Sequence, residues 1–328
     1  MKLKKLTALA VAAMMSMGVL AGCGSTANKG TANDGKTYNV GICQLVQHEA
    51  LDAATKGFQD VLTEKLGDKV SFSYQNAQGD SATCSTIVNQ FLSDGVDLIL
   101  ANATAALQAS SSATNTVPII GTSITDYATA LDIDDWTGAT GFNVTGTSDL
   151  APLAKQAEMF KELLPDAKKI GILYCSNEPN SKYQADIVAE ELGKLGYETE
   201  HFSFSDSNDV AAVTTSACNA VDALYIPTDN TAASNTSLID SIASSKNIPI
   251  IAGEEGICAG CGIATLSISY EEIGRIAGEM AYDILVNGAD PATMDIKFAT
   301  DPQKKYVASR CEALGITVPD TYEELVTE

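Results

Sequence analysis

Short apolar runs alternate with amphipathic stretches along most of the chain. Residues 40–45 and 96–101 are mostly apolar, and each run is followed by a stretch in which apolar residues recur every three or four positions. After the first run, Leu51, Ala54 and Phe58 fall on one stripe of a helix. Apolar strands that alternate with helices are typical of parallel sheets covered by helices on both faces.

The same pattern predicts the individual elements. Strands are expected over residues 40–45, 70–74, 96–101, 118–120, 169–174, 198–204, 223–226, 249–252 and 263–268. Helices are expected over residues 50–66, 81–93, 105–112, 149–164, 182–195, 209–219, 231–245 and 270–287.

The alternation is interrupted once and then restarts. Gly141, Gly146 and several threonines break the pattern near 143–148, where we expect the chain to cross between two domains. A further strand and helix over 263–287 are expected to return to the first sheet. The prediction is an α/β protein with two doubly wound parallel-sheet lobes joined by several crossings. The first lobe would take residues 37–145 and 254–288, and the second 146–253 and 289–328.

The first 22 residues have the pattern of an export signal. Three lysines within the first five residues precede an apolar stretch over 6–20 and then small residues. A membrane-spanning helix is the alternative, but the stretch is short for that and lacks charge on its far side. No second apolar run of spanning length occurs in the sequence.

The end of this signal resembles a bacterial lipoprotein box. Its residues are Leu20-Ala21-Gly22-Cys23, and in lipoproteins the cysteine is acylated and becomes the first mature residue. Several acyl chains hold a protein on a membrane where a single chain does not. Cys23 is therefore the predicted lipidation site, on the outer face of the bacterial cytoplasmic membrane. Residues 23–36 are small and polar and are expected to form a flexible tether.

Composition narrows the choice of partners. The chain has 42 acidic and 20 basic residues, a net charge of −22, which argues against nucleic-acid binding. Seven cysteines besides Cys23 are an odd number for a disulfide framework, and several lie in apolar runs where a thiol packs as a small hydrophobe. Cys258 and Cys261 fit a loop, a local disulfide, a redox pair or half a metal site. With only two histidines in the chain, no metal or cofactor is predicted.

Polar residues follow the predicted strands of both lobes. In open parallel sheets, ligands bind beyond the carboxyl ends of the strands, where helix N-termini converge. The loops found there carry hydroxyls, amides and acids with almost no basic residues. Hydroxyls and free helix N–H groups suit a carboxylate, and Asp229 and Glu254 can hold an ammonium group, so a small zwitterion fits. The alternative is that these residues only cap their helices.

Catalytic motifs are scarce. His48 stands directly before a helix without the second histidine of a zinc-protease motif, and no serine elbow, phosphate loop or dinucleotide fingerprint occurs. The prediction is that the protein is not an enzyme.

Five segments resemble one family. They are Gly41–Phe58 with its Gln-His-Glu-Ala-Leu-Asp opening, Asn76–Asp80, Gly141–Asp149, the Pro-Thr-Asp-Asn turn over 227–230, and Gly253–Gly256. Together they are similar to the ABC-transporter substrate-binding lipoproteins of the tryptophan/tyrosine transport family, over about residues 38–319.

The resemblance implies a type I periplasmic-binding-protein fold with three crossings and a ligand in the interlobe cleft. It implies hinge closure around an amino acid, with aromatic ones favoured, and delivery to a membrane permease driven by an ATPase subunit. The protein would act as a monomer. Combined with the strand-end loops, it gives these ligand-binding candidates: Gln44, Ser123, Asp126, Asn143, Asp149, Asn177, Asp229, Asn230 and Glu254. Tyr127, Trp136, Tyr183 and Tyr270 are candidate walls for an aromatic ring.

Two departures from the family pattern bear on the ligand. Glu254 stands where the family commonly has aspartate, and Glu49 replaces the usual proline after His48. A sugar or a nucleoside bound on the same scaffold is the first alternative. A sugar is disfavoured because sugar sites usually include arginine and the chain has only two arginines. An exported enzyme is the second alternative. A ligand-sensing regulator is excluded by the export signal at its start.

Overall fold

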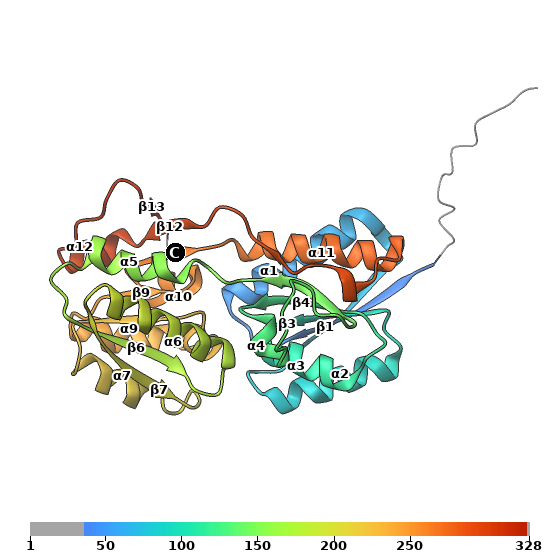
Figure 1. Ribbon diagram of the computed structural model, residues 1–328, viewed down its shortest axis with the longest axis horizontal. Helices are drawn as coiled ribbons and strands as arrows, with labels where there is room; N and C mark the ends of the chain where they lie inside the picture. The colour runs from blue at the N-terminus through green and yellow to red at the C-terminus, as the bar shows by residue number, and fades with distance from the viewer. Residues whose placement is uncertain (1–35, 327–328) are drawn as a thin grey trace, which may run out of the picture. The chain divides into compact units, whose positions relative to one another are not determined.

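The computed structural model describes residues 36–326, which form two parallel-sheet lobes (Figure 1). The predicted signal and Cys23 lie outside the described residues. In the first lobe a six-stranded sheet has the order β11-β5-β4-β3-β1-β2, with all its pairings parallel. Its strands are β1 (Tyr38–Gln44), β2 (Val70–Asn76), β3 (Leu98–Asn102), β4 (Ile119–Ile124), β5 (Val144–Ser148) and β11 (Lys297–Phe298).

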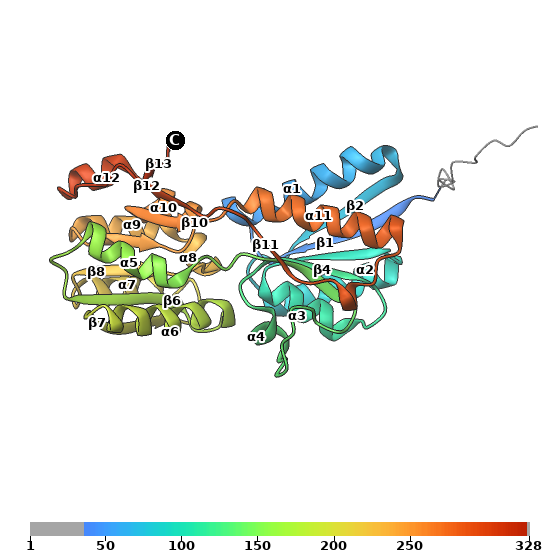
Figure 2. The same cartoon turned by 45° about the horizontal axis from the view of Figure 1, so that its top comes forward.

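Helices cover both faces of this sheet, as its buried strands require (Figure 2). On one face Phe58 and Leu62 pack with Ala277 and Met280, and a separate cluster with Cys84 and Phe91 fills the other face. The helices are α1 (Glu49–Leu66), α2 (Ser81–Asp94), α3 (Thr104–Ala113), α4 (Tyr127–Leu131) and α11 (Tyr270–Asn287), with short 3₁₀ turns at 67–69 and 291–293.

The second lobe is built around a seven-stranded sheet of order β13-β12-β10-β9-β8-β6-β7. Within it, β12 pairs antiparallel with β10. The strands are β6 (Lys169–Cys175), β7 (Glu198–Phe204), β8 (Ala223–Ile226), β9 (Ile250–Ala252), β10 (Ala264–Ser267), β12 (Gln303–Tyr306) and β13 (Glu323–Glu324). The helices are α5 (Leu153–Leu163), α6 (Pro179–Lys194), α7 (Val210–Cys218), α8 (Asn230–Ala233), α9 (Thr236–Ser245), α10 (Glu255–Cys261) and α12 (Ala308–Ala313).

The chain passes between the sheets three times, which confirms the fold expected from the sequence. The passages follow β5, β10 and β11, at about 149–152, 268–269 and 299–302. Residues 144–148 form strand β5, so the first crossing lies just after the predicted one. Glycine and threonine suggested a break there, but threonine is common in strands. Gly146 allows β5 to approach β4 closely, because a Cβ on it would lie 2.0 Å from the Gly121 carbonyl oxygen.

The next crossing differs from the prediction as well. Strand β10 pairs with β9 and therefore stays in the second sheet, and only the following helix α11 returns to the first lobe. Strand β11 likewise pairs with β5 in the first sheet rather than joining the second. Residues 254–267 and 289–298 thus lie on the opposite side from the one expected.

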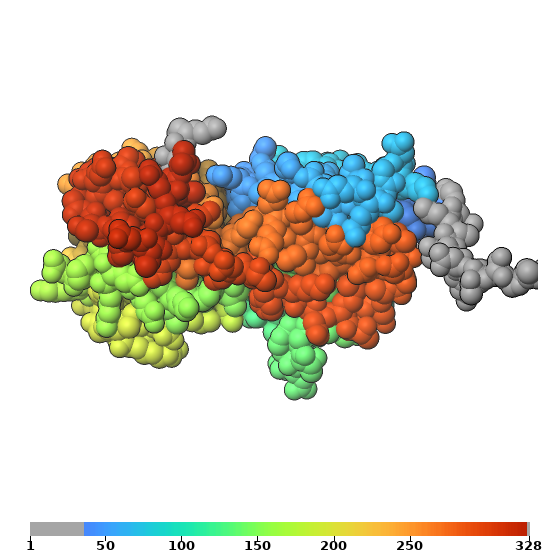
Figure 3. Space-filling model, turned by 90° about the horizontal axis from the view of Figure 1, so that it is seen from above, coloured from blue at the N-terminus to red at the C-terminus, as the bar shows by residue number. Residues whose placement is uncertain are grey.

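The first lobe is held together by helices from opposite ends of the chain. Figure 3 shows α11 lying along α1 on one face of the molecule. Glycines permit the close approach, because a Cβ on Gly274 would lie 2.1 Å from the Ala54 carbonyl oxygen, and one on Gly57 would lie 2.3 Å from that of Glu271.

Seven cysteines fall within the described residues, and all are buried free thiols. Cys258 and Cys261 lie on helix α10, where the Cys261 thiol donates to the Ile257 carbonyl at 3.3 Å. A local disulfide between them is therefore not formed. Over residues 36–326, no helix combines the length and apolarity needed to cross a bilayer, and no group of three or more candidate ligand side chains gathers for a metal ion.

Candidate ligand-binding site

The carboxyl ends of the strands in both lobes border one cavity. It is a small cavity, with an empty volume of about 280 Å³. Residues of the first lobe that line it are His48, Leu51, Ser123, Asp149 and Tyr270. Residues of the second lobe that line it are Asn180, Thr228, Asp229, Asn230, Ala233 and Glu254. The cavity is thus lined by five of the nine predicted ligand residues.

Ser123 contributes a hydroxyl with no bond. It lies near the end of β4 with φ of 56°, a left-handed conformation that is costly for a residue other than glycine. Its side chain is buried, and Oγ has no hydrogen-bond partner in the described structure. Both features, strain and an unsatisfied buried group, are found at functional sites.

Asp149 is a buried carboxylate held by neutral groups. It follows β5, and its two oxygens accept hydrogen bonds from the Thr125 hydroxyl at 3.0 Å and the Tyr270 hydroxyl at 2.9 Å. Burial raises the pKa of the Asp149 carboxyl, and the bonds from Tyr270 and Thr125 act in the opposite direction. A cationic group brought into the cavity would stabilise this charge.

Asp229 and Glu254 face the same cavity, but both already accept hydrogen bonds from backbone amides. Asp229 caps α8 through Ala232 N at 2.7 Å and accepts from Cys175 N at 2.6 Å. Glu254 caps α10 and accepts from Gly256 N at 2.6 Å. Burial raises the pKa of Asp229 to about 8, with the nearby Glu178 adding to the shift, and burial raises the pKa of Glu254 to about 7.

Two hydrogen bonds between side chains join the lobes beside the cavity. The Gln184 amide of α6 donates to Thr125 Oγ1 at 3.2 Å, and the same amide donates to Thr228 Oγ1. His48 Nε2 lies 3.2 Å from Asn230 Oδ1. Because the Asn230 amide nitrogen donates to Glu178, its oxygen is the acceptor and His48 Nε2 carries the proton.

Four predicted residues do not line the cavity. Gln44 is buried and bonds Asp52, Thr55 and the Val46 carbonyl, so it fixes the turn into α1. Asp126 caps α4 through Thr129 N at 2.7 Å. The exposed Asn177 donates to the Ser205 carbonyl at 2.9 Å.

Asn143 lies at the wrong edge of the sheet for a ligand contact. It precedes β5 instead of following a strand, and its amide donates to the carbonyls of Thr114 and Val117 at the amino end of β4. The predicted role rested on its place in a family motif, which does not indicate the edge of the sheet.

Several lining residues were missed in the sequence. Asn180 belongs to the first turn of α6, which begins at Pro179, and proline at a first helical position was a usable signal. The sequence placed His48 directly before a helix, and in the structure it is the N-cap residue of α1, whose side chain makes no cap bond. Among the candidate aromatic walls, Tyr270 lines the cavity, whereas Tyr127 is buried and donates to the Thr147 carbonyl and Trp136 is exposed.

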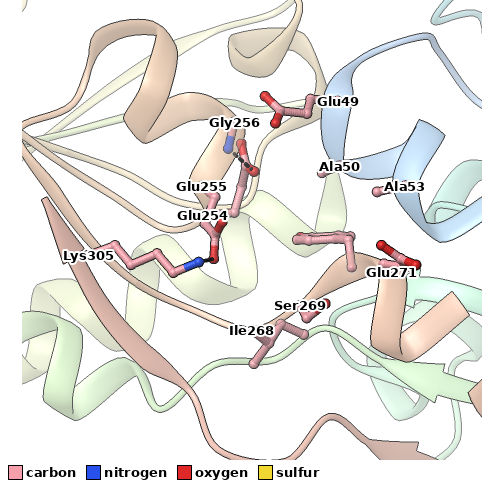
Figure 4. A pocket seen from close by; sticks show the side chains of 11 residues that line it. Glu49, Ala50, Ala53, Glu254, Glu255, Gly256, Ile268, Ser269, Glu271 and Lys305 are labelled. Atoms are coloured by element: carbon pink, nitrogen blue, oxygen red, sulfur yellow. Dashed lines mark hydrogen bonds and ion pairs between the residues drawn. The ribbon is translucent and has the colours of Figure 1, made fainter. Parts of the chain in front are cut away.

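A wider hollow adjoins the cavity across Glu254 and Tyr270. It has an empty volume of about 490 Å³ and lies between the first turns of α1 and α10, as Figure 4 shows. Ala50, Ala53 and Ile268 give it apolar surface. Its one basic side chain within the described chain, Lys305, pairs with Glu255 at 2.7 Å.

The charge of the cavity defines what it can hold. Among the lining residues that the structure describes there is no lysine or arginine, while there are three buried carboxyls. A ligand with a cationic group fits this wall, and a purely anionic one does not. Two lobes, three crossings and a buried polar cavity at the strand ends define a two-lobed receptor for a small solute.

Comparison with known proteins identifies the family. The model of the ABC transporter substrate binding protein family matches residues 39–327. The chain belongs to this family, which confirms the resemblance inferred from its motifs, and it is a substrate-binding protein of an ABC transporter.

Similar proteins cover nearly the whole described chain. A tyrosine-binding protein of Clostridioides difficile (strain R20291) is 38% identical over 293 residues, covering 87% of this chain and 85% of that protein. A Streptococcus pneumoniae domain in complex with L-Trp is 32% identical with a TM-score of 0.85, covering 89% of this chain and 100% of that one. The ligand-free, open structure of a Clostridium difficile substrate binding protein with adhesive properties is 35% identical with a TM-score of 0.68, at 89% and 100% coverage.

Proposed function

We propose that the protein captures an aromatic L-amino acid in the cavity between its lobes and delivers it to the permease of an ABC importer. The observation that carries the proposal is the buried Asp149 carboxyl, whose side-chain partners within residues 36–326 are two hydroxyls, and which faces a cavity with no lysine or arginine among its described lining residues. The ammonium group of an amino acid would pair with it. Two relatives described for tyrosine and L-Trp support the aromatic side chain.

Hinge closure is the proposed capture step. The fold matches a relative in complex with L-Trp at a TM-score of 0.85 and an open, ligand-free one at 0.68, although sequence identity is similar in the two cases. This difference supports a closed arrangement of the two lobes in the structure. Closure would bring Thr125 to Gln184 and His48 to Asn230 and exclude water from the ligand's charged bonds.

The remaining parts of the proposal concern location. An ABC importer takes its solute from outside the cytoplasm, and the export signal with Cys23 at its end supports attachment to the outer face of the membrane by a lipid. The protein would work as a monomer without a cofactor, handing its ligand to the permease while a separate ATPase subunit supplies energy.

Isothermal titration calorimetry with a ligand panel tests the function. L-tyrosine and L-tryptophan are expected to bind, whereas L-leucine binds more weakly and the sugar L-rhamnose and the nucleoside adenosine do not bind. Scanning fluorimetry of the same samples should agree, since a ligand at 100 times its dissociation constant adds about 2.7 kcal/mol to the stability. Binding of only the sugar or the nucleoside would reject an amino acid as the ligand.

A further inference from the structure

Helix α1 begins without a cap. Its N-cap residue is His48, in an extended conformation and with no side-chain bond to the helix. The first bond inside the helix runs from Asp52 N to the His48 carbonyl, so the amides of Ala50 and Leu51 have no partner in the described part of the chain. An 18-residue helix concentrates partial positive charge at such an end.

The open helix end and an open hydroxyl belong to one cavity. His48 and Leu51 line it from α1, and Ser123 lines it from the end of β4. Four buried side-chain atoms of the described structure lack a partner, and Ser123 Oγ is the one whose residue lines this cavity. With 6% of Ser123 exposed, water does not readily satisfy this hydroxyl.

Other polar groups in the cavity are engaged or negatively charged. The amides of Asn180 and Asn230 donate to protein acceptors, and His48 Nε2 donates to Asn230. The oxygens of Asp229 and Glu254 accept hydrogen bonds from backbone amides, and those of Asp149 accept from hydroxyls. An anionic group therefore finds free donors at the first turn of α1 and at Ser123.

We infer that the α-carboxylate of the ligand binds to the Ala50 and Leu51 amides together with the Ser123 hydroxyl. This inference rests on the proposed function and fixes the orientation of the amino acid, with its ammonium group toward Asp149. The ligand carboxylate replaces the cap that α1 lacks. It also satisfies the hydroxyl that folding leaves buried without a bond.

A pair of variants at one position tests the helix end. Both His48→Ser and His48→Ala remove the bond to Asn230, but only serine can cap α1 and occupy its free amides. His48→Ser should therefore melt at a higher temperature than His48→Ala. It should also bind L-tyrosine about fivefold more weakly than His48→Ala does. Calorimetry with tyramine, which lacks the carboxylate, should show no difference between the two variants.

Ser123→Gly tests the hydroxyl without straining the backbone. Glycine accepts a φ of 56°, so the variant should melt no lower than the wild type, while its affinity for L-tyrosine falls at least tenfold. Its affinity for tyramine should stay within twofold.

The outcomes separate the two proposals. If wild-type protein binds neither L-tyrosine nor L-tryptophan, the proposed function fails. The carboxylate site is wrong if the protein binds them but His48→Ser and Ser123→Gly leave their affinity unchanged, or if tyramine binds as tightly as tyrosine. The ligand panel alone then decides whether the protein binds amino acids.

Discussion

The two lobes place similar side chains at the ends of similar strands, yet they use them differently. In the second lobe, the carboxyl oxygens of Asp229 and Glu254 accept hydrogen bonds from backbone amides of α8, α10 and Cys175. Within the described part of the first lobe, Asp149 has two hydroxyl partners, the Ser123 hydroxyl has none, and helix α1 starts without a side-chain cap. At the cavity, the acids of the second lobe are bonded to their own lobe, while the first lobe presents a hydroxyl and a helix end that a ligand can bond.

This difference has a physical lesson for interpreting such clefts. A carboxylate that accepts two amide bonds stabilises the loop that carries it, and removing it costs stability. A carboxylate without a cationic or amide partner is costly to bury and gains from a ligand. Acidic side chains at the edge of a sheet therefore need their partners counted before a role is assigned.

The largest expected effect is at Asp149. Asp149→Asn keeps the shape of the side chain but removes the charge that would pair with an ammonium group. Affinity for L-tyrosine should fall about 100-fold, which corresponds to about 2.7 kcal/mol, as measured by calorimetry. The melting temperature should not fall, because a buried charge is removed. An affinity within fivefold of the wild type would contradict the assignment.

Asp229→Ala should give the opposite pattern. The variant loses the α8 cap and leaves the Cys175 amide unpaired, so the free energy of unfolding in urea should fall by roughly 2 kcal/mol. Affinity for L-tyrosine should change less than threefold. Equal stability with lost binding would make the two lobes alike and refute the comparison.

The hydrogen bond from Gln184 to Thr125, which joins the two lobes, should affect the rate of ligand dissociation more than the equilibrium affinity. Gln184→Ala removes the amide that bridges Thr125 and Thr228, a loss of about 1 kcal/mol. We expect ligand dissociation to be about fivefold faster in stopped-flow experiments. Small-angle scattering of the saturated variant should also reveal a larger open fraction. Gln108→Ala is the control, because that amide bonds the Ala130 carbonyl within the first lobe.

The smallest effect concerns pH. Burial raises the pKa of Glu254 to about 7 in the folded protein, above its ordinary value of 4.5. The folded state therefore binds more protons between these two values, and this carboxyl makes stability fall as pH rises from 4.5 to 7. One group contributes at most about 1.4 kcal/mol per pH unit, and we expect a fraction of that. Glu254→Gln should flatten the slope in urea titrations, and an unchanged slope would place the cause elsewhere.

Much of the fold was predictable because its strands are apolar and its helices amphipathic. The bounds expected for 198–204, 223–226 and 270–287 coincide with β7, β8 and α11. The strands of the last 35 residues were not predicted, since β11, β12 and β13 are short and partly or fully exposed and carry no apolar run. Which sheet receives β10 depends on its packing partners, which the pattern of a single strand does not contain.

The site was predictable to the extent that topology fixes it. The rule that ligands lie beyond strand ends predicted Ser123, Asp229, Asn230 and Glu254, and the family resemblance added Asp149; all five line the cavity. It could not distinguish a carboxyl that is bonded to backbone amides from one that is left for a ligand. The amides that bond Asp229 and Glu254 belong to the backbone of their own and neighbouring loops, which the strand pattern does not show. It also could not pair His48 with Asn230, which are 182 residues apart and meet only across the lobes.

The seam between α1 and α11 has a consequence for how the chain comes to be folded. Helix α1 packs closely, at Gly57 and at Gly274 of α11, onto a helix that the ribosome makes about 200 residues later. The first lobe therefore cannot complete the helical layer on this face of its sheet until residues 270–287 have been synthesised. For the same reason, no single cut in the gene releases either lobe as an independent product.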